Sequence, residues 1–295
     1  MRNNEDRLGA QGAAHEPPPP QNLGIPAPQA GADSLMSFVT PTEFVELPSQ
    51  GRFYAEGHPL HGEETIEIKY MTAKEEDILT SKSLLKKGIA IDRLLQSLIV
   101  DKRIKVSELY TGDRNAILIA ARSSGYGPEY NTNITCPNCT TTDRHSFNLE
   151  EVEPVTFDDL EEVWAKYGVV FDEETKTIKI TLPKTRAVVS CRLLKGQDEA
   201  GMIRKKEKMR KHKLQADSMM TDQFKAFVVA VNGNDNSSLV HQFIDHLPVM
   251  DSRELRTVYA KCVPNIDMTQ DFSCNACGFE QALEVPFTTD FFWPK

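Results

Sequence analysis

Hydrophobic and polar positions alternate along the first well-patterned stretch of the chain, which is the periodicity of β-strands. Within residues 37–54, short strands are indicated around a turn at 48–51 by hydrophobic positions at Phe44, Leu47 and Phe53. Another strand is predicted over 64–71, where alternate positions on one face are hydrophobic: Ile66, Ile68 and Tyr70. The folded part of the chain should therefore begin with β-strands.

Three helices are predicted next, because hydrophobic positions recur three and four residues apart. The first begins at Thr72, where Glu75 completes a capping box, and runs toward Gly88. The second covers 89–104 and has one broad apolar face. The third begins after Thr111, and it ends at the two glycines that precede Pro128: Gly125 and Gly127.

A later stretch changes character partway along. Residues 176–194 indicate two strands that join around Pro183 and Lys184. From about Gln197 to Cys262 the pattern is helical. This region should therefore be mixed, with helices dominating its second half.

Two Cys-x-x-Cys pairs stand far apart, each inside a strand-like run: Cys136 with Cys139, and Cys274 with Cys277. A two-residue gap lets a tight turn direct both sulfurs at one ion, and four thiolates form the tetrahedral shell of structural zinc. Gly278 suits such a turn because it tolerates positive φ. The pattern predicts one Zn²⁺ site shared by two hairpins, a zinc ribbon, and the ion would close a long intervening segment.

Other roles for these thiols are a redox dithiol or unrelated buried cysteines. A redox pair normally precedes a helix, whose dipole lowers the thiol pKa, and the sequences after Cys139 and Cys277 are not typical helix starts. The remaining cysteines, Cys191 and Cys262, sit among apolar neighbours and are interpreted as small core residues. Zinc is therefore the interpretation that we adopt.

The predicted fold class is α+β: a helical domain fused to a four-cysteine zinc ribbon made of two hairpins, with a mixed α/β insertion between the hairpins. The expected domains are a Pro/Ala/Gly-rich tail that is too polar to order itself, N-terminal strands with three helices and the first zinc hairpin, the inserted region, and the second zinc hairpin with an aromatic C-terminal tail. Their bounds are 1–33, 34–150, 151–265 and 266–295.

Composition limits the class of protein. The chain has 295 residues, of which 40% are hydrophobic, so it can form one large core or two modest ones. No run approaches the roughly 20 apolar residues of a membrane span, and no signal peptide is evident. We expect a soluble intracellular protein in a reducing compartment, where thiolates can bind metal. The net charge of −9 argues against a surface devoted to nucleic acid.

Two segments permit more than one interpretation. The basic run Arg204–Lys213 could contact nucleic acid or an acidic partner, but it is more often the solvated face of a helix. The proline run Pro17–Pro20 could be a polyproline ligand, although an extended linker is the simpler interpretation.

The sequence contains no phosphate-binding glycine loop, no GxSxG motif and no HExxH helix. The seven histidines are scattered. His58 and His61 lie in a turn-rich segment, and His145 lies near the first cysteine pair, but the four cysteines already complete the predicted tetrahedral shell. A closed four-sulfur shell leaves no position for water or substrate, so the zinc would be structural. We therefore expect that the protein is not an enzyme.

Several segments together resemble the baseplate hub proteins of T-even-type contractile-tailed bacteriophages. The resemblance covers about residues 43–150 and the C-terminal end, through these segments: FVELPSQGRFYAEGHPL, IEIKYMTAKEEDILTS, LYTGDRNAILIAARSSGYG, CPNC and FTTDFFWPK. It implies a hub subunit or an assembly factor, located in the host cytoplasm during assembly or in the virion tail baseplate. Its partners would be other baseplate hub or tail proteins. The resemblance carries no function onto residues 150–262.

Aromatic residues at the C-terminal end are candidates for partner binding: Phe291, Phe292 and Trp293. The alternative is that this tail packs onto the chain's own core. As competing functions we keep a nucleic-acid-binding zinc-ribbon accessory protein and a thiol oxidoreductase.

Overall fold

The computed structural model describes residues 40–211, 219–285 and 289–292. Within it, Thr40–Lys295 form one compact unit. The predicted tail at 1–33, Trp293 and the end of the basic run lie outside the described residues. The domain boundaries predicted from the sequence therefore stay predictions.

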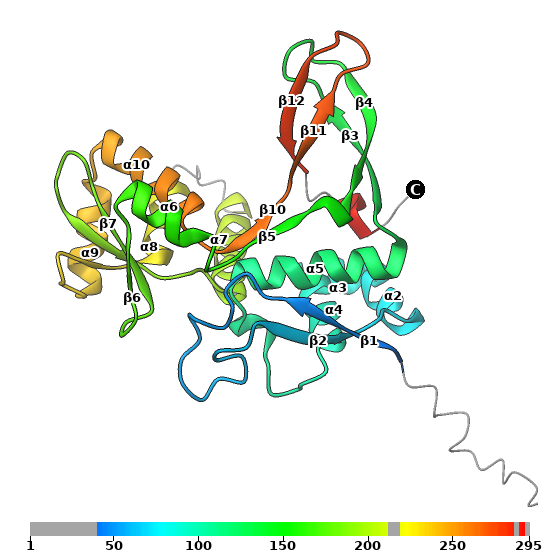
Figure 1. Ribbon diagram of the computed structural model, residues 1–295, viewed down its shortest axis with the longest axis horizontal. Coiled ribbons are helices and arrows are strands. Elements are labelled where there is room, and N and C mark those ends of the chain that lie inside the picture. Colours follow the sequence, from blue (N-terminus) through cyan, green and yellow to red (C-terminus); the bar gives the residue numbers. More distant parts are fainter. Residues whose placement is uncertain (1–39, 212–218, 286–288, 293–295) are drawn as a thin grey trace, which may run out of the picture. The chain divides into compact units, whose positions relative to one another are not determined.

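A two-stranded antiparallel sheet and a group of helices form the N-terminal part (Figure 1). Alternating burial along the two strands places Val45, Ile66 and Ile68 in the core, as the period of two predicts. Tyr70 follows the second strand and is exposed. In chain order the elements are β1 (Thr42–Glu46), β2 (Thr65–Lys69), α2 (Ala73–Thr80), α3 (Lys82–Lys86), α4 (Ala90–Leu98), η1 (Val106–Glu108) and α5 (Thr111–Tyr126).

The helix predicted from Thr72 to Gly88 is broken, and this corrects the sequence interpretation. The capping box is present, because the Glu75 carboxylate accepts the backbone N–H of Thr72 at 3.1 Å. However, Ser81 is extended and divides the segment into α2 and α3. The Thr80 hydroxyl donates to the Glu76 carbonyl, a competing local bond that weakens helices. Hydroxyl residues here interrupt a pattern that is otherwise helical.

Helix α5 is the predicted third helix, and its first turn holds a buried polar network. The carboxylate of Asp113 accepts the Ser49 N–H at 3.0 Å, the Ser49 hydroxyl at 2.7 Å and the Tyr54 hydroxyl at 2.8 Å. Asp113 is fully buried, and burial raises its pKa. These bonds attach the loop between β1 and β2 to α5. Removing the Asp113 carboxylate would leave three buried donors unpaired, which would destabilise the fold.

The end of α5 carries a second polar anchor. Arg122 is buried, and its guanidinium donates to the carbonyls of Phe291 at 2.6 Å, Gly127 at 2.6 Å and Glu129 at 3.0 Å. It also lies over the Tyr126 ring, 5.5 Å from the centroid. One side chain therefore connects α5 with the start of the first hairpin and with η3 (Thr289–Phe292) near the C-terminus.

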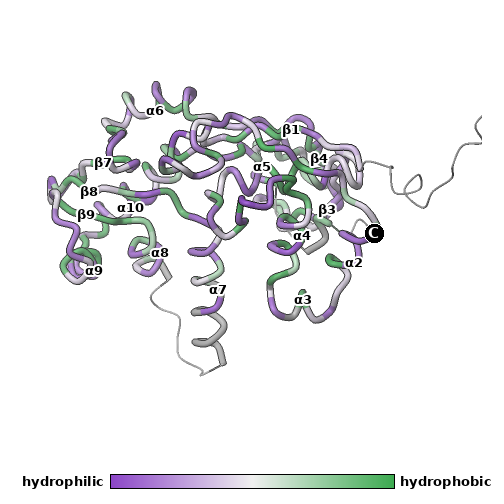
Figure 2. Tube along the Cα trace, turned by 90° about the horizontal axis from the view of Figure 1, so that it is seen from below, coloured by the Kyte–Doolittle hydropathy of each residue, from purple (hydrophilic) through white to green (hydrophobic). Residues whose placement is uncertain are grey.

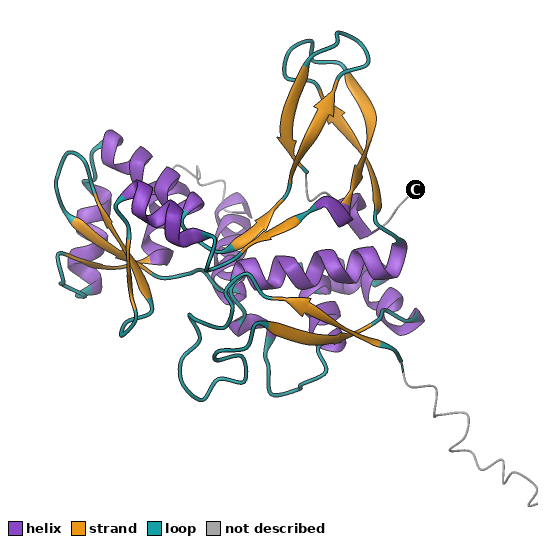
Figure 3. Ribbon diagram, in the orientation of Figure 1, coloured by secondary structure: helices purple, strands orange, loops and turns teal. Residues whose placement is uncertain are grey.

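The two hairpins lie side by side (Figure 3). The first consists of β3 (Glu129–Thr135) and β4 (Thr142–Asn148), and the second of β11 (Thr269–Ser273) and β12 (Glu280–Glu284). Each is a separate two-stranded antiparallel sheet. The predicted pair of hairpins is confirmed.

The chain between the hairpins contains a four-stranded antiparallel sheet in the order β6-β7-β8-β9, with helices. Figure 2 shows hydrophobic positions along β8 and β9. The elements are η2 (Leu149–Glu151), β5 (Glu153–Val155), α6 (Leu160–Tyr167), β6 (Val170–Asp172), β7 (Thr177–Thr181), β8 (Val188–Cys191), α7 (Gly196–Lys211), α8 (Met219–Phe227), β9 (Val228–Val231), α9 (Ser237–Asp245), α10 (Val249–Lys261) and β10 (Asn265–Asp267).

The predicted helical span from Gln197 to Cys262 is wrong at β9. Residues 228–231 form the strand that completes the sheet beside β8. Three of these four residues are valines, whose branched side chains suit a sheet, and a turn at Gly233 follows with positive φ. A four-residue strand flanked by helices is too short to give a clear period.

The insertion packs on the N-terminal part through aromatic rings. The Phe53 ring centroid lies 5.7 Å from that of Phe157 and 4.9 Å from that of Phe171, both in edge-to-face geometry. The indole N–H of Trp164 donates to the Cys262 carbonyl at 2.9 Å. The long loop after β1 thus contacts residues more than a hundred positions later in the sequence.

We predict that Phe291 stabilises the fold from the C-terminal end. Its side chain is 2% exposed and packs edge-to-face on Tyr130, with ring centroids 5.1 Å apart. Phe291→Ala should lower the free energy of unfolding by about 3 kcal/mol or more. The matched control is Phe44→Ala, because the Phe44 side chain is 72% exposed and its removal should change little. Urea unfolding compares the two variants, and equal small losses would contradict the packing role.

Candidate metal centre

The turns that carry the two cysteine pairs repeat one backbone pattern. In the first hairpin the Cys136 N–H donates to the Thr141 carbonyl at 2.9 Å, and the Thr140 N–H donates to the Cys136 carbonyl at 2.9 Å. The second hairpin has the same bonds at the same offsets. The Cys274 N–H donates to the Phe279 carbonyl at 2.9 Å, and the Gly278 N–H donates to the Cys274 carbonyl at 2.8 Å. Two equivalent turns therefore present the four thiols.

The residue after each second cysteine has a left-handed backbone. Gly278 has a φ of +67°, as the sequence indicated, and Thr140 occupies the equivalent position with a φ of +58°. A β-branched residue rarely adopts this conformation, since its side chain crowds the backbone. The first hairpin therefore keeps the same turn geometry, but the left-handed backbone costs conformational energy at Thr140 that it does not cost at Gly278.

The four sulfurs meet between the hairpins. The Sγ atoms of Cys136 and Cys277 are 3.8 Å apart, those of Cys139 and Cys274 are 3.7 Å apart, and all four lie within 4.8 Å of one another. A regular tetrahedron with zinc–sulfur bonds of about 2.3 Å has sulfur–sulfur edges of about 3.8 Å. The cross-hairpin distances therefore match a four-thiolate metal shell.

The structure also bears on the alternative roles of these thiols. All six cysteines are free, and the sulfurs that approach across the hairpins are well beyond the disulfide bond length of about 2.05 Å. Neither pair precedes a helix, because β4 and β12 follow the two turns. Hydrogen bonds from the side chain and backbone of Thr141 lower the pKa of the Cys139 thiol to about 6. The arrangement is that of four thiols from two turns that could serve together as metal ligands.

Further contacts align the hairpins from tip to base. Near the tip, the Asn275 amide donates to Asp143 at 3.2 Å. Midway, the His145 ring lies between two phenyl rings, with centroids 4.6 Å from Phe147 and 5.3 Å from Phe272. At the base, the Gln270 side chain accepts the Asn148 N–H at 3.1 Å and donates to the Asn148 carbonyl at 2.5 Å. His145 thus packs between the hairpins, and the candidate cluster consists of cysteines alone.

The insertion leaves and rejoins the hairpins through paired strands. β5 and β10 are antiparallel neighbours, with Val155 opposite Asn265. The Asn265 side chain also accepts a hydrogen bond from the Asn115 amide of α5 at 3.1 Å. At Gly112 of α5, a Cβ atom would lie 2.3 Å from the Pro264 carbonyl oxygen, so only glycine fits there. The two ends of the insertion are therefore fixed against α5 directly beside the hairpins.

The other residues singled out from the sequence lie in different surroundings. Phe291 and Phe292 are each 2% exposed, so these two side chains pack in the chain's own core, which was the alternative to a partner anchor. Cys191 and Cys262 are buried, as the core interpretation predicted. Arg204 of the basic run is exposed on α7, while the side chains of 205–211 and residues 212–213 lie outside what the structure describes.

The polar side chains around the candidate metal centre are not predicted from the sequence. Polar residues of short strands and turns form the hydrogen bonds that join the two hairpins, and their role is visible only once the hairpins are paired. These residues are Gln270, Asn148, Asn275 and Asp143. Arg122 carried one usable signal, a charged residue among the small and apolar residues of α5. Nothing in a single sequence identifies the carbonyls that it would bind.

Comparison with known proteins gives one match. The family model described as T4 bacteriophage base plate protein matches residues 40–293. No curated protein and no solved structure matches the chain. Within the described residues, every helix is too short or too polar to cross a membrane.

We predict opposite effects of exchanging the two left-handed residues. Gly278→Ala should lower the free energy of unfolding by about 1 kcal/mol, because the backbone there is left-handed while the space around a new Cβ is open. Thr140→Gly should be neutral or stabilising, because it relieves strain in the equivalent turn. Chemical unfolding with zinc present measures both. A destabilising Thr140→Gly together with a harmless Gly278→Ala would contradict the equivalence of the turns.

Proposed function

This chain belongs to the T4 bacteriophage base plate protein family, and we propose that it performs its structural role at the central hub of the tail baseplate. The family match over residues 40–293 is the observation that carries the proposal. Membership gives the chain a structural part in the phage baseplate, and hence a place in the virion tail. The hub position is our finer proposal, and it is supported by the resemblance of residues 43–150 to hub proteins.

We propose that Cys136, Cys139, Cys274 and Cys277 hold one structural Zn²⁺. The sulfur spacing and the paired turns support this assignment. A bound zinc would supply a cross-link of four metal–sulfur bonds between hairpins that the chain itself separates widely. The four cysteines would fill the tetrahedral shell, so this site would stabilise a surface for assembly and would not bind a substrate.

The protein's action would then consist of contacts with other tail proteins, made in the host cytoplasm while the baseplate assembles. The net charge of −9 favours protein partners over the phosphate backbone of nucleic acid. Exposed hydrophobic side chains on the insertion, such as Val249 at 84% exposure and Met250 at 56%, are suited to such contacts.

A complementation experiment tests this function. A phage whose copy of this gene is inactivated is grown in a host that supplies the wild-type chain, the double variant Cys274→Ser/Cys277→Ser, or the control Glu64→Gln. We expect complete tails and plaques with wild type and control. Electron microscopy should show incomplete baseplates with the cysteine variant, because its second hairpin can no longer share a metal with the first.

Mass spectrometry of purified wild-type baseplates then separates the two roles within this proposal. A subunit is present in the finished particle, whereas an assembly factor is required but absent from it. Complete, infectious tails in the total absence of the chain would overturn the proposed function.

A further inference from the structure

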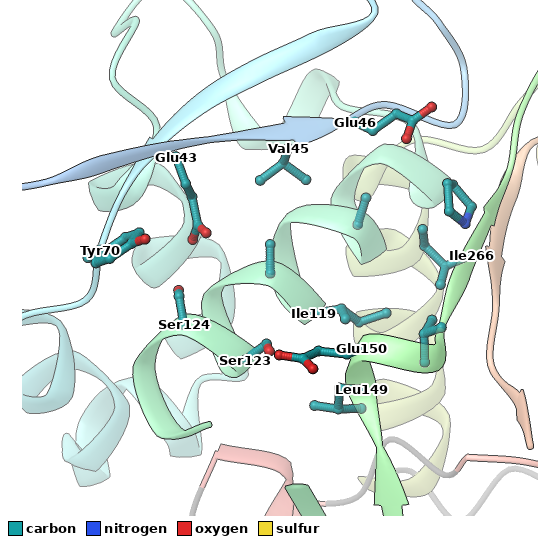
Figure 4. Close-up of a pocket in the computed structure, with 14 residues that line it drawn as sticks. Glu43, Val45, Glu46, Tyr70, Ile119, Ser123, Ser124, Leu149, Glu150 and Ile266 are labelled. Carbon is teal, nitrogen blue, oxygen red and sulfur yellow. The ribbon is translucent and has the colours of Figure 1, made fainter. Parts of the chain in front are cut away.

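A groove of about 440 Å³ runs along α5, away from the metal centre. Figure 4 shows β1 on one side of it and Leu149 and Glu150 on the other, with α5 between them. The floor includes small residues of α5, namely Ala116, Ala120 and Ser123. Small side chains let another backbone approach closely, and the groove is within the size range of ligand-binding clefts.

One wall of this groove is a strand with an open edge. In the described part of the chain, β1 pairs with β2 alone. The Tyr70 N–H donates to the Pro41 carbonyl, and the Leu47 N–H donates to the Glu64 carbonyl. Hydrogen-bonded pairs alternate along an antiparallel ladder, so the odd-numbered residues of this strand face β2. The backbone N–H and C=O of Phe44 therefore point to the open edge.

The groove is also acidic. The described residues that line it include three glutamates, Glu43, Glu46 and Glu150, and no lysine or arginine. The side chain of Glu43 points from β1 toward α5 (Figure 4), and its Oε1 atom is buried without a hydrogen-bond partner among the described residues. A buried carboxylate oxygen without a donor is costly, and a cationic or N–H group of a bound segment would pair with it.

We propose that this groove binds an extended segment of a partner protein, which adds a strand to the open edge of β1. The segment would carry lysine or arginine on the face toward α5, where Glu43 lies, and hydrophobic residues on the opposite face, beside the exposed Phe44. Strand addition uses the main-chain bonds that Phe44 offers, while the floor and the acidic rim select the side chains. Because β1 has five residues, the bound stretch would be about as long.

A second copy of the chain fits this edge poorly. Pairing two copies through β1 would bring two acidic strands together, with Glu43 and Glu46 of each copy close to the same glutamates of the other. Like charges on directly opposed strands repel. A basic partner removes this repulsion. The groove alone sets the chemistry of the segment, whereas the segment's origin in another tail protein rests on the proposed function.

The test uses the full chain and a synthetic probe. The probe is a seven-residue peptide of alternating valine and lysine, acetylated and amidated at its ends. We expect saturable one-to-one binding, with NMR shifts that concentrate at β1, α5 and residues 149–154. Two control peptides should bind at least about tenfold more weakly: one with glutamate in place of lysine, and one with the same charge but with N-methylated backbone amides along one edge.

Variants locate the site. Of the backbone donors of β1, Phe44→Pro removes only the N–H that faces the open edge, and the phenyl side chain that it also removes is 72% exposed. The variant should therefore retain the fold and weaken peptide binding at least about tenfold, whereas Phe44→Ala, which keeps the N–H, should weaken it less. Glu43→Gln should weaken binding at least about threefold, while Glu64→Gln, an exposed glutamate outside the groove, should not. If Phe44→Pro does not fold, Glu43→Gln and the N-methylated peptide still decide.

Three results would overturn the proposal. The first is no binding of the valine–lysine peptide by the full chain. The second is equal binding of the N-methylated peptide, which would indicate charge attraction without strand addition. The third is a dimer in sedimentation experiments that Phe44→Pro dissociates, which would make a second copy the occupant. Peptide binding can fail while the complementation experiment succeeds, so the two proposals are tested separately.

Discussion

The convergence of four cysteine sulfurs is the constraint on which the arrangement of this protein depends. Cys139 and Cys274 approach to 3.7 Å although they are 135 positions apart in the sequence. Short two-stranded hairpins have little core of their own and are marginally stable alone. The cysteine cluster lies at the tip and the Gln270–Asn148 bonds lie at the base, so the two hairpins contact each other at two separate points.

Helix α5 connects this ribbon with the rest of the chain. Its first turn holds the loop after β1 through Asp113, and its last turns hold β3 and η3 through Arg122. Both side chains are buried, and each makes three hydrogen bonds to groups far from it in the sequence or in the adjoining turn. Buried polar networks of this kind specify one arrangement of the chain as well as stabilising it. The pairing of β5 with β10 beside α5 allows a large insertion to enter and leave without disturbing the hairpins. Helix α5 and the two hairpins therefore form a frame to which the other regions are attached.

The sequence predicted features that depend on local periodicity or on exact spacing. The cysteine pairs, Gly278, the Glu75 capping box and the extent of α5 all belong to this class. It did not predict the break at Ser81 or the strand β9, because tertiary contacts override weak local preferences there. The partners of Arg122 and Asp113 were also out of reach, since a buried polar network depends on which backbone groups the fold brings together. Phe291 illustrates the same limit. From the sequence alone, an aromatic residue near the C-terminal end could bind a partner or pack in the chain's own core, and only its surroundings in the fold distinguish the two.

Zinc K-edge X-ray absorption on the full chain, purified under reducing conditions, tests the central claim most directly. We expect about one zinc per chain with four sulfur neighbours at about 2.3 Å. We also expect loss of the whole signal in Cys274→Ser/Cys277→Ser, although Cys136 and Cys139 remain. A natively folded chain without metal, a shell containing nitrogen or oxygen ligands, or a variant that still binds zinc through one pair would contradict this claim.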